Sequence, residues 1–158
     1  MLKLSKLTLL LFSIILGLNS PGFAQLIQKG YFQSPVKPGG RNYLAGNFSE
    51  LRPNHFHTGL DYKFGGAEGE PIYAAATGWI HRIKISSFGY GNVIYLKHPS
   101  GNITVYGHLR NFNPALEAWM KKKMYEAKQN ELELTLKIGE IPIKKGELIA
   151  FGGNTGSS

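Results

Sequence analysis

Short runs in which apolar and polar residues alternate make up most of the chain from about residue 58 onward. A period of two is the spacing of a β-strand that is buried on one face. Turns rich in glycine and proline separate these runs, and this arrangement is typical of an antiparallel all-β domain. The expected strands cover residues 58–64, 71–75, 79–85, 92–98 and 102–109, with a hairpin turn at Pro99–Gly101.

One segment follows the helical period instead. Its apolar residues recur at spacings of three and four: Leu116, Trp119, Met120, Met124 and Ala127. Asn113 and Pro114 form a good helix start, because asparagine is a common N-cap and proline is favoured at the first helical position. We expect a helix over about 114–129, inserted between strands, and favour a structural role at a sheet edge over a mobile lid. Alternation returns over residues 132–138 and predicts a further strand.

The beginning of the chain predicts export. A basic start and an apolar run over residues 7–18 precede a small-residue cleavage site that ends at Ala24, which together indicate a signal peptide over residues 1–24. The apolar run is too short to indicate a membrane span, and an uncleaved anchor is the alternative. Residues 25–50 predict an irregular arm, and residues 51–158 the main domain.

Charge and composition narrow the expected partners. The formal net charge is +8, and the chain contains no cysteine, so the domain must fold without disulfides. An export signal takes the chain away from nucleic acid, and the basic residues are scattered apart from Lys121–Lys123, so we expect no nucleic-acid partner. We expect a monomer in the periplasm, the cell envelope or the medium, with membrane contact only through an uncleaved signal segment.

The candidate chemistry begins with the only aspartate of the chain, Asp61, which lies four residues after His57. In a strand these two positions and Gly59 between them share one face, and the glycine leaves space there. An imidazole and a carboxylate that converge on an empty position are two of the ligands that a zinc ion takes. The alternative is a surface turn with an incidental histidine and aspartate.

A second candidate lies in the run over residues 102–109. Strict alternation turns its odd-numbered apolar residues toward the core and places Thr104, Tyr106 and His108 on the polar face. A histidine on such a face is by itself most simply a surface residue, but beside a zinc site it can act as a proton acceptor. The other histidines are weaker candidates: His55 as a loop residue or outer ligand, His81 as a strand packing residue, and His98 as a hydrogen-bonding residue at the hairpin turn.

Six motifs follow one another in an order that gives the chain a resemblance to a known family. They are Asn54–Asp61, Gly69–Ala75, Gly89–Ile94, Tyr106–Leu109, Lys145–Ala150 and Gly153–Ser157. With them the chain resembles the lysostaphin or LytM type of zinc metallopeptidase, which cuts the peptide part of bacterial peptidoglycan. The resemblance covers about Leu51 to Ser158, roughly two-thirds of the chain.

The resemblance implies a mainly β fold, a single antiparallel domain of lysostaphin-like type with an open groove and one zinc at its floor. His57 and Asp61 match the first two zinc ligands of the family, and His108 matches the histidine that assists catalysis beside the metal. The implied activity is that of an exported endopeptidase, a cell-wall hydrolase whose partners are peptidoglycan stem or bridge peptides.

One feature of the family is not found in the sequence given. The family completes its site with a His-x-His pair after the Gly-Asn-Thr-Gly turn, whereas this sequence ends at Ser158 within that turn. We therefore expect a truncated member that binds zinc weakly and is inactive in this form. The alternatives are a non-catalytic domain that binds or regulates cell-wall hydrolases, and an envelope-binding module that uses only the groove and its positive charge.

Overall fold

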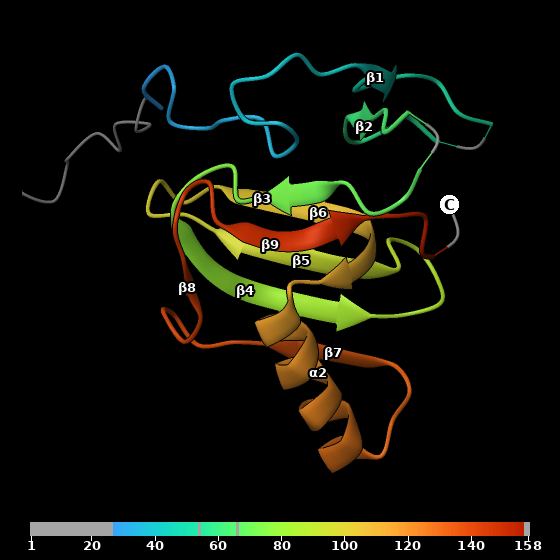
Figure 1. The fold of residues 1–158 in the computed structure, drawn as a ribbon, viewed down its shortest axis with the longest axis vertical. Helices are drawn as coiled ribbons and strands as arrows, with labels where there is room; N and C mark the ends of the chain where they lie inside the picture. The colour runs from blue at the N-terminus through green and yellow to red at the C-terminus, as the bar shows by residue number, and fades with distance from the viewer. Residues whose placement is uncertain (1–26, 54, 66, 157–158) are drawn as a thin grey trace, which may run out of the picture.

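The computed structural model describes residues 27–53, 55–65 and 67–156, and the expected signal peptide lies outside these residues. The elements of the described chain are, in order, β1 (Leu44–Gly46), β2 (Asp61–Tyr62), β3 (Pro71–Tyr73), β4 (Gly78–Ile85), β5 (Asn92–Lys97), β6 (Ile103–Phe112), α2 (Pro114–Ala127), β7 (Leu132–Thr135), β8 (Pro142–Ile143) and β9 (Leu148–Gly152). The expectation of a mainly β fold with one inserted helix is confirmed for this part of the chain (Figure 1).

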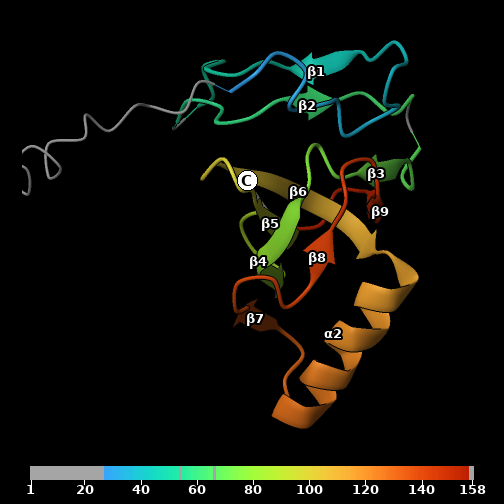
Figure 2. The same cartoon turned by 90° about the vertical axis from the view of Figure 1, so that its left-hand side faces the viewer.

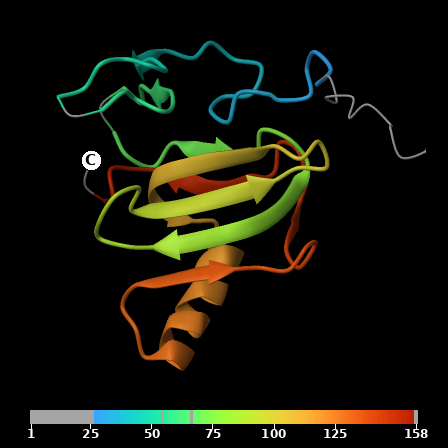
Figure 3. The same ribbon diagram turned by 180° about the vertical axis from the view of Figure 1, so that it is seen from behind.

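One curled antiparallel sheet forms the body of the molecule. Its strand order is β3-β9-β6-β5-β4-β7, and β8 adds to it by pairing with β4. Strands β4, β5 and β6 lie side by side as a continuous meander, which Figure 3 shows from behind. The separate ribbon of β1 and β2 lies beyond the β3 edge, and α2 projects from the opposite end of the long axis (Figure 2).

The strands expected from the alternating runs over 71–75, 79–85, 92–98 and 102–109 correspond to β3, β4, β5 and β6. The hairpin turn between the last two is also confirmed, since the Gly101 N–H donates to the His98 carbonyl at 2.9 Å. The strand expected over 58–64 is wrong in extent, because only Asp61 and Tyr62 are in β2. The backbone of His57 instead pairs with the loop before it, donating to Glu50 O and accepting from Ser49 N, both at 2.8 Å.

The alternation expected along β6 has the wrong phase over its first half. Tyr106 is buried at 7% exposure, whereas Ile103 and Val105 are 44% and 47% exposed. The Tyr106 side chain can enter the core because its hydroxyl accepts hydrogen bonds from Ala75 N and from the Thr104 hydroxyl, each at 2.9 Å. A buried aromatic ring removes more apolar area from water than a β-branched side chain, so tyrosine takes the inward position.

A β-bulge in β6 then restores the expected phase. Ile94 of β5 lies opposite Tyr106, and Asn92 lies opposite Leu109, so β6 carries one residue more than its partner between these pairs. The additional residue switches the side of the strand that faces inward, and Leu109 returns to the core at 2% exposure. The bulge falls at Gly107 and His108.

Helix α2 begins and packs as the sequence predicts. The Asn113 side chain accepts from Leu116 N at 2.9 Å, and Pro114 is the first helical residue. Leu116 and Met120 are buried against the sheet, which agrees with a structural helix. The helix ends at Ala127, two residues before the expected 129, because Lys128 adopts a left-handed conformation with φ 53°. No helix in the described ranges has the length and apolar character needed to cross a membrane.

Residues 27–50 are built into the domain. Gln33 N donates to Ala75 O, Tyr73 N donates to Pro35 O, and Val36 is buried at 3% exposure. Strand β1 then pairs with β2, with Gly46 opposite Asp61. The segment therefore brings residues 46–52 alongside both candidate zinc ligands.

We predict that Tyr106→Phe destabilises the domain by about 1–3 kcal/mol, because the buried Ala75 N–H loses its acceptor. Burial raises the pKa of the Tyr106 phenol above its usual value of about 10. The pKa of the Tyr106 phenol is therefore higher in the folded protein than in the unfolded protein, and its stabilisation of the fold is complete below the unfolded pKa. This stabilisation declines as the pH rises from the unfolded pKa through the folded pKa.

The measurement is urea unfolding at neutral and alkaline pH, with Tyr125→Phe as control because Tyr125 is 83% exposed. The deficit of Tyr106→Phe relative to the wild type should narrow above about pH 10. Equal stabilities of the two variants at neutral pH, or a deficit that does not change with pH, contradict this account.

Candidate metal centre

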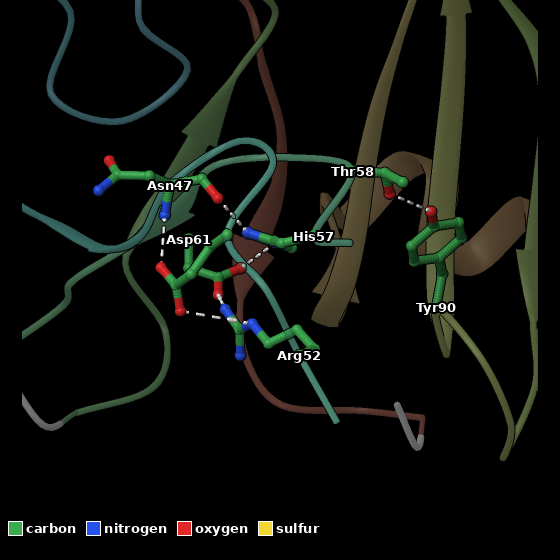
Figure 4. A network of polar contacts seen from close by, with 7 residues as sticks. Asn47, Arg52, His57, Thr58, Asp61 and Tyr90 are labelled. Carbon is green, nitrogen blue, oxygen red and sulfur yellow. Dashed lines mark hydrogen bonds and ion pairs between the residues drawn. The ribbon is translucent and has the colours of Figure 1, made fainter. Parts of the chain in front are cut away.

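His57 and Asp61 lie in contact. The His57 Nε2 atom is 3.1 Å from the Asp61 Oδ1 atom, and the two side chains are 16% and 43% exposed (Figure 4). Asp61 begins β2, whereas His57 lies in the loop before it. The expected convergence is therefore present, but loop geometry produces it rather than the alternation of one strand.

A backbone carbonyl sets the orientation of the His57 ring. His57 Nδ1 lies 2.9 Å from Asn47 O, and a carbonyl can only accept, so Nδ1 carries the proton and donates. Nε2 then directs its lone pair at the Asp61 carboxylate. Two acceptor atoms 3.1 Å apart are stabilised by a proton or a cation between them.

The donor set and the space around it fit zinc. Imidazole nitrogen and carboxylate oxygen bind zinc at about 2.0–2.2 Å, so atoms this close together can share one ion. A zinc-bound histidine commonly donates its other ring N–H to a carbonyl, as His57 does here to Asn47. A Cβ atom placed on Gly59 would lie 3.9 Å from His57 Nε2, so the missing side chain keeps the approach to that nitrogen open.

The second oxygen of Asp61 is held by an arginine. Arg52 Nη2 donates to Asp61 Oδ2 at 2.8 Å, and Arg52 Nε lies 3.5 Å from Glu50 Oε1. Figure 4 shows the guanidinium beside the carboxylate, on the side away from the imidazole. This contact leaves Oδ1 as the oxygen that faces His57.

His108 lies at the β6 bulge in a strained backbone conformation, with φ 54°. Its N–H donates to Tyr90 O at 2.8 Å, and its Nδ1 lies 2.8 Å from Thr155 O. As with His57, the carbonyl requires the proton on Nδ1, so the neutral ring carries a lone pair on Nε2. Bulges re-aim side chains and are common beside active sites, and strained residues cluster there as well.

Tyr90 connects the two candidate positions. Its ring meets the His108 ring edge to face at a centroid distance of 5.9 Å, and its hydroxyl is 3.2 Å from the Thr58 hydroxyl. Thr58 follows His57 directly, and Figure 4 shows its side chain turned toward Tyr90. Tyr90 thus contacts both His108 and the residue next to His57.

The Gly-Tyr-Gly-Asn and Gly-Asn-Thr-Gly motifs pack against each other to hold His108. The Thr155 hydroxyl donates to Leu109 O at 2.8 Å and accepts from Asn92 N at 3.0 Å. A Cβ atom on Gly91, whose φ is 61°, would lie 2.5 Å from Thr155 O, so only glycine permits this approach. The contact fixes the carbonyl that accepts from His108.

The remaining histidines lie elsewhere. His98 is buried at 1% exposure, with its ring nitrogens 2.9 Å from Thr77 O and from the Thr104 hydroxyl, which confirms a hydrogen-bonding role at the hairpin. His81 is half-buried on β4, and His55 is exposed in the loop before His57. Among the described residues, no three His, Cys, Asp or Glu side chains gather as a metal-binding group, so these residues supply two candidate ligands.

Comparison with known proteins assigns the family. Peptidase family M23 matches residues 55–124, a range that contains His57, Asp61 and His108. An uncharacterized metalloprotease of Haemophilus influenzae is 31% identical over 139 residues, which are 87% of this chain and 23% of that protein. The chain belongs to peptidase family M23.

Other relatives of this M23 chain carry more specific names. The DD-carboxypeptidase/endopeptidase Mpg of Neisseria meningitidis serogroup B is 32% identical over 102 residues, 65% of this chain and 17% of the relative. The protein of the same name from Neisseria gonorrhoeae matches with the same values. The M23 chain thus spans less than a quarter of the length of these curated relatives.

Proposed function

We propose that this M23 chain contributes His57, Asp61 and His108 to the active site of an exported zinc metallo-endopeptidase, which hydrolyses stem or bridge peptides of bacterial peptidoglycan. The observation that carries the proposal is the pair formed by His57 Nε2 and Asp61 Oδ1, two acceptor atoms 3.1 Å apart. A cation is the partner that stabilises such a pair in a metallopeptidase fold.

His57 and Asp61 are the proposed zinc ligands, and the Asn47 carbonyl holds the imidazole in the tautomer that binding needs. A bound zinc supplies Lewis-acid activation of water and of the peptide carbonyl. The family resemblance places a further histidine ligand after the Gly153–Gly156 turn. The position of Thr155, whose carbonyl accepts from His108, supports this placement, because the turn already reaches the site.

His108 is the proposed proton-transfer residue. With Nδ1–H committed to Thr155 O, its Nε2 takes up a proton from the attacking water and holds it as a donor toward the developing negative charge. The bulge, the Tyr90 carbonyl and the Tyr90 ring fix the direction of this nitrogen, so little reorganisation is needed during the reaction.

The peptidoglycan substrate is supported by two lines of argument. Relatives that match 65% of the chain are named DD-carboxypeptidase/endopeptidase, which describes cleavage next to D-amino acids. The amino-terminal sequence predicts export, and the chain without residues 1–24 keeps a net positive charge, which attracts it to anionic envelope polymers. Both lines support a peptidoglycan substrate.

We predict that the domain completed by the family's His-x-His pair, called the full-length protein below, binds about one zinc ion per chain, and that His57→Ala or Asp61→Ala removes most of it. Metal content after dialysis, measured by plasma emission, tests this. The matched control is His55→Ala, which removes an exposed imidazole two positions away. Unchanged zinc in both site variants contradicts the assignment, and loss in His55→Ala would instead make His55 a ligand.

His108→Ala should lower hydrolysis of purified peptidoglycan by roughly a hundredfold, the scale of general acid–base assistance, with zinc content preserved. His108→Gln keeps most of the side-chain volume but cannot take up a proton, so it should lose activity to a similar degree. Near-normal turnover by the glutamine variant would show that packing, and not proton transfer, is the role of His108. Loss of zinc in either variant would make His108 a ligand.

A further inference from the structure

The segment Gly46–Arg52 contacts both members of the His57–Asp61 pair and lies before residues 55–124, the range that the M23 family matches. We propose that this segment is a built-in support that orients both zinc ligands, with Arg52 as the positioning residue for Asp61. The inference rests on the proposed zinc site and assigns new residues to it.

Arg52 selects which oxygen Asp61 presents. A carboxylate can bind a metal through either oxygen or through both, and rotation about its last bond exchanges them. The 2.8 Å charge-assisted hydrogen bond from Arg52 Nη2 to Oδ2 removes this freedom and leaves Oδ1 facing His57 Nε2. The expected benefit is geometric, since a half-exposed ion pair by itself contributes little to stability.

Glu50 ties the support of Asp61 to the support of His57. Its Oε1 atom lies 3.5 Å from Arg52 Nε, and its Oε2 atom accepts from Asn47 N at 3.0 Å. The carbonyl of the same Asn47 accepts from His57 Nδ1. One carboxylate thus forms an ion pair with the guanidinium that orients the aspartate, and accepts from the backbone N–H of the residue whose carbonyl orients the histidine.

The backbone of the segment is shaped to make these contacts. Ser49 adopts a left-handed conformation with φ 62°, which closes a tight turn between Asn47 and Glu50. Gly46 lies directly over the ion pair, since a Cβ atom there would be 2.6 Å from both Arg52 Nη2 and Asp61 Oδ2. The left-handed conformation of Ser49 and the lack of space for a side chain at Gly46 indicate that the backbone of this segment is shaped around the Arg52–Asp61 ion pair.

The test measures zinc affinity rather than turnover. Residues that support metal ligands typically change metal affinity by ten- to a hundredfold when replaced. In the full-length protein, Arg52→Gln should therefore raise the zinc dissociation constant by about ten- to a hundredfold, measured by competition with a chromophoric chelator. Arg52→Lys retains the charge but carries its donors on a single nitrogen, which cannot reproduce the separate contacts of Nη2 with Asp61 and of Nε with Glu50. Its zinc dissociation constant should therefore fall between those of the wild type and Arg52→Gln.

Arg82→Gln is the matched control. Arg82 pairs with Glu133 at 2.9 Å on the β4 and β7 side of the sheet, and its side-chain exposure of 37% is close to the 34% of Arg52. Thermal unfolding of the zinc-free proteins separates fold stability from metal binding. We expect the zinc-free forms of Arg52→Gln and Arg82→Gln to have similar midpoint temperatures of thermal unfolding. Only Arg52→Gln should bind zinc more weakly than the wild type.

Zinc affinity of Arg52→Gln within about twofold of the wild type, while His57→Ala has lost zinc, overturns the role of Arg52 and leaves the zinc site standing. Retention of zinc by His57→Ala instead removes the proposed function and this inference together. If zinc-free Arg52→Gln does not fold, Arg52→Lys decides: weaker zinc binding at an unchanged zinc-free midpoint supports the proposal, and unchanged affinity overturns it.

Discussion

The hydrogen bond from His57 Nδ1 to the Asn47 carbonyl is the interaction on which the candidate site depends. It places the ring proton on Nδ1 and so directs the Nε2 lone pair toward Asp61, 3.1 Å away. Without it the imidazole could rotate or adopt the other tautomer, and the pair would lose its metal-binding character. The backbone N–H of Asn47 donates to Glu50, so the orientation of the His57 ring also depends on the turn before it.

The same device recurs at His108. There the Thr155 carbonyl accepts from Nδ1, and a bulge with φ 54° turns the ring out of the strand alternation. Backbone carbonyls are suitable for this purpose because the fold fixes them, whereas a side-chain acceptor can change rotamer. The segment after β9 provides one such carbonyl, at Thr155, and the turn after β1 provides the other, at Asn47.

Local patterns explain which parts the sequence could predict. Strand and helix positions were predicted because they depend on periods of two and 3.6, and Asn113 signalled the start of α2 directly. The pairing of His57 and Asp61 was also anticipated, although the expected strand over 58–64 is mostly a loop. The expected phase of β6 was wrong, because the burial of Tyr106 depends on a hydrogen bond that its hydroxyl accepts from Ala75 N, which is far away in the sequence.

Other parts of the site have no local signal. Asn47 acts through its carbonyl, which every residue has, and Arg52 contacts Asp61 nine positions away without a recognisable motif. Tyr90 lies in a glycine motif that the resemblance includes, yet its contact with Thr58 spans 32 positions. These residues could be found only once the β1–β2 ribbon had been placed beside the sheet.

The most direct test of the central claim is a crystal structure of the zinc-loaded full-length protein with anomalous data at the zinc edge. We predict an anomalous peak about 2.0–2.2 Å from both His57 Nε2 and Asp61 Oδ1, with His57 Nδ1 still donating to Asn47 O. A peak bound through His57 Nδ1, or a zinc that contacts neither residue, would contradict it.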